Sequence, residues 1–239
     1  MAAPPPLKLY RSNGSCSIVP HSILLHYDIP FTPVVMRSAA GTQMSDGGFW
    51  EAADGSLSNR DYLAINPMGY VPAITVGGGT DDATTITENL AVMTYIAFLI
   101  PEQNLLGTGD LDRARVAEWM AWLLITVHSN GFGALARQYR FVTDRAMYGA
   151  VRERGREVVT ASYERINERL EGREFAVGDA LTIVDFYLYP FWRWGELQGF
   201  DMQKYPAYGR HLRKIEALEG VRKALVAEGL TPCFGDGSA

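Results

Sequence analysis

The sequence predicts an α/β half followed by an all-α half in a chain of 239 residues. Near the N-terminus, a strand, a helix and a second strand follow one another within about 30 residues, which is the size of a βαβ unit. A run rich in β-branched residues then precedes a glycine-rich turn, as in a hairpin. From about residue 110 onward, the apolar residues recur almost throughout at helical spacing.

The composition is that of a soluble globular protein, with 47% apolar and 21% charged residues. A net charge of −5 gives no long-range attraction to phosphate, so we expect neither a nucleic-acid partner nor an anionic membrane partner. Two cysteines exclude a disulfide framework and favour a reducing compartment. The N-terminus does not resemble a secretory signal, and no apolar run is long enough to cross a membrane. We therefore predict a cytoplasmic protein.

The N-terminal residues predict a strand, a helix and a second strand. Residues 7–10 form a short strand, residues 17–27 form a helix whose Pro20 is tolerated in the first turn, and residues 31–36 form the next strand. Residues 38–61 contain four glycines among polar residues and are interpreted as a long loop.

The hairpin and the helices follow. Strands are predicted at residues 71–76 and 84–87, and a helix is predicted to begin at Glu88 and to end near residue 99. The all-α half contains helices at residues 112–140, 144–171, 183–195, 206–216 and 219–228, and Thr182 with Asp185 fits a capping box. A boundary near residues 100–110 divides the chain into domains 7–100 and 110–230.

Cys16 lies where the turn after the first strand meets the first helix. The positive end of the helix dipole favours a thiolate there. A small, inert buried cysteine is an equally good interpretation of this position.

Two further segments have a structural and a functional interpretation. Pro72 either begins a strand as an ordinary trans proline or follows a cis bond that leaves the main chain of Val71 free to pair with an extended ligand. Thr87-Glu88-Asn89 begins a helix, which offers N–H groups to a carboxylate and the Glu88 side chain to an ammonium group, although capping alone explains many such starts.

His128 follows an apolar helix face, where a structural histidine is more common than a base. The sequence contains no HExxH, CxxC or paired Cys/His spacing, so we expect no metal site.

Taken together, these segments resemble a cytosolic glutathione S-transferase, most similar to the bacterial beta class. The residues that carry the resemblance are Leu7-Lys8-Leu9-Tyr10, Gly14-Ser15-Cys16-Ser17-Ile18, His21, the segment from Asn66 to Ile74, Thr87-Glu88, Ala91-Val92-Met93-Thr94-Tyr95, Glu118-Trp119, His128, Thr182-Ile183-Val184-Asp185, Tyr187-Leu188 and Arg193-Trp194. The resemblance extends from about residue 7 to residue 230.

The resemblance implies a thioredoxin-like N-terminal domain, an all-helical C-terminal domain and a homodimer. Glutathione would be the cosubstrate, with its cysteine main chain paired to Val71 beside a cis Pro72 and its γ-glutamyl end on Glu88 and Asn89. Cys16 would face the glutathione sulfur, and His128 would reach it from the α domain.

The predicted activity is transfer of glutathione to a largely apolar electrophile. His128 would transfer a proton, and Ser17 would donate a hydrogen bond to the thiolate. Asn89 replaces the small residue usual after the glutamate, and Ala121, Ile125 and Thr126 replace polar groups, which predicts an apolar pocket. The alternatives are glutathione-dependent isomerisation of a conjugated alkene and a non-catalytic ligand-binding protein of the same fold. Arg37 and Arg60 stay open as partners of the glycine carboxylate.

Overall fold

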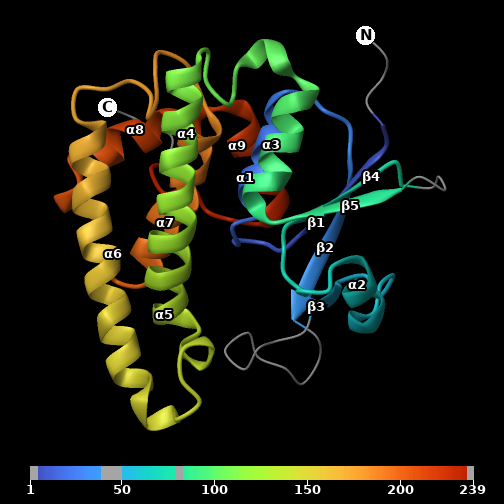
Figure 1. The fold of residues 1–239 in the computed structure, drawn as a ribbon, viewed down its shortest axis with the longest axis horizontal. Helices are drawn as coiled ribbons and strands as arrows, with labels where there is room; N and C mark the ends of the chain where they lie inside the picture. Colours follow the sequence, from blue (N-terminus) through green and yellow to red (C-terminus); the bar gives the residue numbers. More distant parts are fainter. Residues whose placement is uncertain (1–4, 39–49, 79–82, 236–239) are drawn as a thin grey trace.

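The computed structural model describes residues 5–38, 50–78 and 83–235. Within these ranges, a mixed sheet of five strands is followed by a group of helices (Figure 1). The fold class predicted from the sequence is thus confirmed.

The sheet has the order β3-β2-β1-β4-β5. Strand β1 (Leu7–Arg11) pairs in parallel with β2 (Thr32–Ser38) and antiparallel with β4 (Ala73–Val76). Strand β5 (Thr84–Thr87) completes the hairpin with β4. Two members of the predicted turn, Gly77 and Gly78, are described, and residues 79–82 lie outside the described residues. The parallel pair follows from the helix α1 (Ile18–His26) between β1 and β2.

The prediction of one continuous loop at residues 38–61 is wrong in the part that the structure describes; residues 39–49 lie outside it. Strand β3 (Trp50–Ala52) pairs antiparallel with β2, and helix α2 (Asn59–Ile65) begins before the predicted loop ends. The helix starts there because the Ser58 hydroxyl accepts a hydrogen bond from the Asp61 N–H at 3.2 Å. A three-residue strand gives too short a pattern to be predicted.

Helices cover the two faces of the sheet differently (Figure 1). Helices α1 and α3 (Asn89–Leu99) contribute to a core that continues into the helical part of the chain. Helix α2 and β3 enclose a smaller second cluster, made by Tyr10, Met36, Trp50, Ala52, Tyr62 and Ala73. Because the larger core crosses residues 100–110, the division into domains 7–100 and 110–230 stays a prediction.

The helical part begins with α4 (Asp110–Trp122), and it departs from the predicted helix at residues 112–140. A π-helical segment occupies Leu123–Phe132, α5 is only Gly133–Ala136, and a 3₁₀ turn follows at Gln138–Arg140. Apolar periodicity predicts that these residues are helical but does not distinguish α from π hydrogen bonding.

The remaining helices agree closely with the sequence prediction. They are α6 (Tyr148–Leu170), α7 (Ile183–Leu197), α8 (Pro206–Ala217) and α9 (Glu219–Glu228). The capping box at the start of α7 is confirmed, because the Thr182 N–H donates to Asp185 Oδ2 at 2.7 Å. Helix α9, near the end of the chain, packs against α1, near its beginning. In the described part of the chain, no helix has the length and hydropathy that crossing a membrane requires.

Candidate active site

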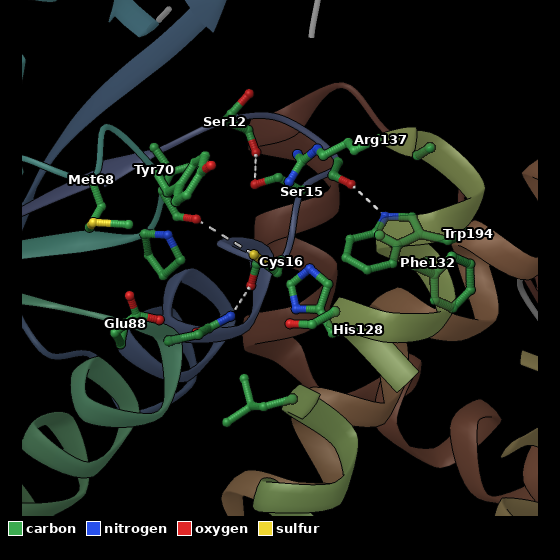
Figure 2. A pocket seen from close by; sticks show the side chains of 18 of the residues that line it. Ser12, Ser15, Cys16, Met68, Tyr70, Glu88, His128, Phe132, Arg137 and Trp194 are labelled. Atoms are coloured by element: carbon green, nitrogen blue, oxygen red, sulfur yellow. Dashed lines mark hydrogen bonds between the residues drawn. The ribbon is translucent and has the colours of Figure 1, made fainter. Parts of the chain in front are cut away.

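A cavity of about 700 Å³ lies between the sheet region and the helices (Figure 2). One side, the sheet wall, consists of Ser12, Asn13, Gly14, Ser15, Cys16, Trp50, Asn66, Met68, Tyr70, Val71, Pro72, Glu88, Asn89 and Leu90. The other side, the helical wall, consists of Leu124, Ile125, His128, Ser129, Phe132, Gly133, Ala136, Arg137, Arg140, Trp194, Leu197 and Gln198. The volume is in the range of small-molecule sites.

Cys16 lies at the centre of the sheet wall, just before α1. Its Sγ donates to the Val71 carbonyl at 3.6 Å, and its own carbonyl accepts from the Asn89 side-chain amide at 2.9 Å (Figure 2). Burial raises the pKa of the Cys16 thiol to about 11, although Arg137 and Asn89 act in the opposite direction. Of the two interpretations that the sequence left open, this pKa favours the buried, un-ionised cysteine, because desolvation outweighs the groups that lower the pKa.

The Val71–Pro72 bond is cis, which decides between the two alternatives that the sequence left open. The Tyr70 carbonyl accepts from the Tyr62 hydroxyl at 2.6 Å and from the Asn66 side-chain amide at 2.7 Å. These bonds anchor the segment that precedes β4 and bring Val71 beside Cys16.

Glu88 precedes α3 with a φ of +67°, a conformation that residues with a side chain seldom adopt. Such strain is typical of functional sites. Its side chain is exposed and lines the cavity. Asn89 is buried, and its Oδ1 has no hydrogen-bond partner among the residues that the structure describes. The Asn89 side chain thus links the start of α3 to the main chain of Cys16.

Ser17 does not lie in the cavity. Its buried hydroxyl donates to the Ser12 carbonyl at 3.1 Å and accepts from the Ser12 N–H at 3.0 Å. The Ser17 hydroxyl therefore stabilises the turn between β1 and α1 from outside the cavity. The prediction that it donates to a sulfur in the cavity is wrong. Ser15, two residues earlier, lines the cavity instead. Sequence adjacency to Cys16 did not distinguish the two hydroxyls.

His128 reaches the cavity from the π-helical segment. Its Nδ1 lies 2.8 Å from the Tyr187 hydroxyl, and its ring contacts Phe191 and Trp194. Desolvation, together with the nearby charges of Arg137 and Arg140, lowers the pKa of His128 to about 4. The ring is therefore neutral at physiological pH.

The structure brings Cys16, Val71, Pro72, Glu88, Asn89 and His128 to one cavity, together with Ile125. Ala121, Thr126, Arg37 and Arg60 do not line it, and Arg37 is paired with Glu51 at 3.0 Å. Arg137 and Arg140 were missed. Two arginines three residues apart near a helix end can indicate an anion-binding site, but the same spacing is common on solvated surfaces.

No group of three metal-ligating side chains comes together in the ranges that the structure describes.

Comparison with known proteins agrees with this geometry. A sphingomonad glutathione S-transferase, solved in complex with glutathione, is 31% identical, with a TM-score of 0.75 over 94% of this chain and 100% of that one. The chain belongs to the glutathione S-transferase family. Residues 138–219 match the family described as "Glutathione S-transferase, C-terminal domain".

Other relatives place the chain among the bacterial-type glutathione S-transferases. The beta-class enzyme of Sphingomonas chungbukensis is 28% identical, with a TM-score of 0.76 over 94% of this chain and all of that one. The curated glutathione S-transferase GST-4.5 of Xanthomonas campestris is 29% identical over 94% of this chain and its own full length. The maleylacetoacetate isomerase maiA of Aspergillus fumigatus is 27% identical over 92% of this chain and 90% of its own.

Proposed function

We propose that this member of the glutathione S-transferase family binds glutathione along the sheet wall and adds its sulfur to an electrophile held by the helical wall. One observation carries the proposal: a single cavity joins Glu88, Val71, Cys16 and His128, from four segments distant in the sequence. The sphingomonad relative named above was solved with glutathione bound, which supports the choice of cosubstrate.

In this proposal, the sheet wall positions glutathione. The Glu88 carboxylate holds the γ-glutamyl ammonium group, and the N–H groups at the start of α3 hold the adjacent carboxylate. The main chain of Val71 pairs with the cysteine of glutathione, as in an added strand. The Asn89 side-chain amide fixes the carbonyl of Cys16 with one N–H at 2.9 Å, and its second N–H and its unpartnered Oδ1 are left for the γ-glutamyl end of glutathione.

The glutathione sulfur would then lie beside Cys16. Because the pKa of Cys16 is raised to about 11, its S–H is a hydrogen-bond donor at neutral pH and not a competing nucleophile. The neutral His128 accepts the glutathione proton, since the charge of the bound thiolate opposes that of the two arginines and favours the protonated ring. The thiolate forms a carbon–sulfur bond, and the electron pair leaves with a leaving group or moves to an adjacent carbonyl and is protonated.

The first test is a calorimetric titration with reduced glutathione. We expect a dissociation constant in the micromolar to millimolar range, on the order of −4 to −8 kcal/mol. Turnover with chlorodinitrobenzene should fall in both Cys16→Ala and His128→Ala. Absence of binding heat would remove the cosubstrate and favour the non-catalytic alternative; unchanged turnover in both variants would remove the proposed roles.

The isomerase alternative is favoured by relatives named maleylacetoacetate isomerase, among them the maiA protein of Aspergillus fumigatus. In that reaction, the thiolate adds to a conjugated alkene, the carbon–carbon bond rotates, and the thiolate leaves again. Mass spectrometry of the products separates the two reactions, because a transferase leaves a thioether and an isomerase regenerates free glutathione.

The proposal includes a cytoplasmic homodimer. A groove of about 530 Å³ between α3 and α4 contains Leu90, Thr94 and Phe98, and Phe98 is 66% exposed, which supports a partner surface there. Light scattering should give twice the chain mass for the native protein and the chain mass for Phe98→Asp. A native monomer would contradict this part of the proposal.

A further inference from the structure

Two arginines of the helical wall face the cavity, and no described residue of opposite charge pairs with them. Arg137 directly follows α5 as its C-cap residue, and Arg140 is the last residue of the 3₁₀ turn that comes next. Both arginines line the cavity. Among the ion pairs between described residues, none includes either guanidinium, whereas Arg154, on the exposed side of α6, pairs with Glu157 at 2.6 Å. Arg137 is half-buried, whereas Arg140 is exposed. Because a half-buried guanidinium group is usually paired, the missing partner of Arg137 points to a missing ligand.

The two side chains are presented by a rigid turn. The buried amide of Gln138 donates to the Ala134 carbonyl at 2.7 Å and so satisfies the end of α5. The Arg137 N–H donates to the Gly133 carbonyl at 2.8 Å, and the Arg140 N–H donates to the Arg137 carbonyl at 3.0 Å. Fixed main-chain positions on both sides favour a binding role over that of a freely solvated pair.

The cavity also constrains the side chains themselves. The Arg140 guanidinium lies over the Tyr70 ring, 4.5 Å from its centroid, and thereby connects the helical wall with the sheet wall. Figure 2 shows Arg137 extending from the helical wall toward the turn that carries Ser15 and Cys16. Glu88 lies on the opposite side of Cys16 in the same view.

Both positive charges act on the reacting groups. Burial lowers the pKa of Arg137, and Arg140 lowers it further; the charge of Arg137 in turn lowers the pKa of Cys16, and both arginines lower that of His128. An anion bound between the two guanidinium groups relieves their mutual repulsion and the desolvation of Arg137. A carboxylate matches the planar fork of arginine in two parallel hydrogen bonds.

We propose that Arg137 and Arg140 form a carboxylate subsite, and that the electrophile accepted by this protein carries a carboxylate group close to its reacting carbon. The inference rests on the proposed function and names the substrate class for the same cavity. It adds a carboxylate to the largely apolar acceptor predicted from the sequence, and the apolar part of that acceptor contacts Ile125, Phe132 and Trp194. The same chemistry has a second source, the glycine carboxylate of glutathione, and the experiment separates the two.

The test uses two glutathione conjugates that differ in one carboxylate, S-(p-carboxybenzyl)glutathione and S-benzylglutathione. Calorimetric titrations of the wild-type chain, Arg137→Met and Arg140→Met are compared. We expect each variant to bind the carboxybenzyl conjugate about 10-fold to 100-fold more weakly, which is the range for a charge-assisted hydrogen bond, and to bind the benzyl conjugate as the wild type does. Arg137→Lys should bind with intermediate affinity, because charge is retained while the fork is lost.

Arg154→Met is the matched control, since it removes the same charge from an exposed ion pair on α6. Equal weakening of both conjugates and of glutathione itself would overturn the inference in favour of the glycine carboxylate. Unchanged binding of both conjugates in every variant would overturn it as well. If the wild-type chain bound neither glutathione nor either conjugate, the proposed function itself would fail, an outcome distinct from the other two.

Discussion

The sheet wall meets the cavity largely with main-chain groups, whereas the helical wall meets it with side chains. The sheet wall offers the strained backbone of Glu88, the start of α3 and the Val71 carbonyl beside a cis proline. The helical wall offers His128, a group of aromatic rings and two guanidinium groups. Main-chain recognition depends on local backbone shape and is retained when side chains change. If the sheet wall binds the cosubstrate as proposed, the helical wall can acquire a new specificity by substitution while the cosubstrate stays the same.

The first prediction concerns a buried contact through which helix α9 stabilises the sheet wall. The buried Glu228 of α9 accepts from the Gly14 N–H at 2.8 Å and lies 2.8 Å from His21 Nδ1 and 3.8 Å from Arg11. Glu228→Ala leaves Arg11 buried without its counter-charge, so we expect a loss of about 3–5 kcal/mol in the free energy of unfolding. Urea denaturation measures it.

Glu219→Ala on the same helix is the control, because Glu219 is exposed and its pair with Lys223 is worth at most about 1 kcal/mol. Equal destabilisation by the two variants would show that the sheet wall does not depend on this buried contact.

The second prediction tests the Cys16 thiol at the centre of the sheet wall. A pKa raised to about 11 leaves about a hundred-fold less thiolate near neutral pH than in an ordinary cysteine. In a Cys233→Ser background, alkylation of Cys16 by iodoacetamide should be slower by about that factor and should rise steadily with pH through the alkaline range.

Adding Arg137→Met should slow the alkylation further, because it removes a charge that lowers the pKa of Cys16. Rapid alkylation that levels off near neutral pH would contradict both expectations and would favour the thiolate, the other interpretation that the sequence left open.

The third prediction separates the walls by substrate. Glu88→Gln keeps the shape of the side chain and removes its charge, so glutathione binding should weaken by about 10-fold to 100-fold. Turnover at saturating glutathione should change less, since the helical wall is untouched. Kinetics with glutathione and acceptor varied independently give both values.

Glu102→Gln, on an exposed turn after α3, is the matched control. A higher KM for the acceptor with an unchanged KM for glutathione would contradict the prediction, because it would show that Glu88 binds the acceptor and not glutathione.

The fourth prediction disturbs the helical wall alone. A Cβ on Gly155 of α6 would lie 2.8 Å from the Ala134 Cβ and 2.9 Å from the Gly131 carbonyl. Gly155→Ala should therefore push α5 away and lower the free energy of unfolding by about 1–3 kcal/mol. Gly149→Ala, where nothing lies within 4 Å, should be neutral or stabilising by up to about 1 kcal/mol.

Acceptor turnover should decrease in Gly155→Ala while glutathione affinity is retained. Loss of glutathione affinity without a change in acceptor kinetics would show that the two walls are not independent.

The two walls also differ in how far the sequence predicts them. For Val71, Pro72, Glu88 and Asn89, the local residues left a structural and a functional interpretation open, and only the family resemblance implied their place in the site. The same resemblance implied the place of His128 on the helical wall. Arg137 and Arg140 follow a π-helical segment of ten residues, which changes the faces on which later side chains lie. No α-helical pattern accounts for that change. The burial that overrides the dipole at Cys16 likewise depends on residues from distant helices, such as Tyr187.

The turn that carries Cys16 is held by residues made late in protein synthesis. Trp194 Nε1 donates to the Gly14 carbonyl at 2.9 Å, and Glu228 lies 214 positions after Gly14. A ribosome adding 5–20 residues per second needs roughly 10 to 40 s to travel that distance. A nascent chain can thus pair its strands well before the turn that carries Cys16 receives its two anchoring bonds. The ability to bind glutathione should appear only when almost the whole polypeptide has left the ribosome.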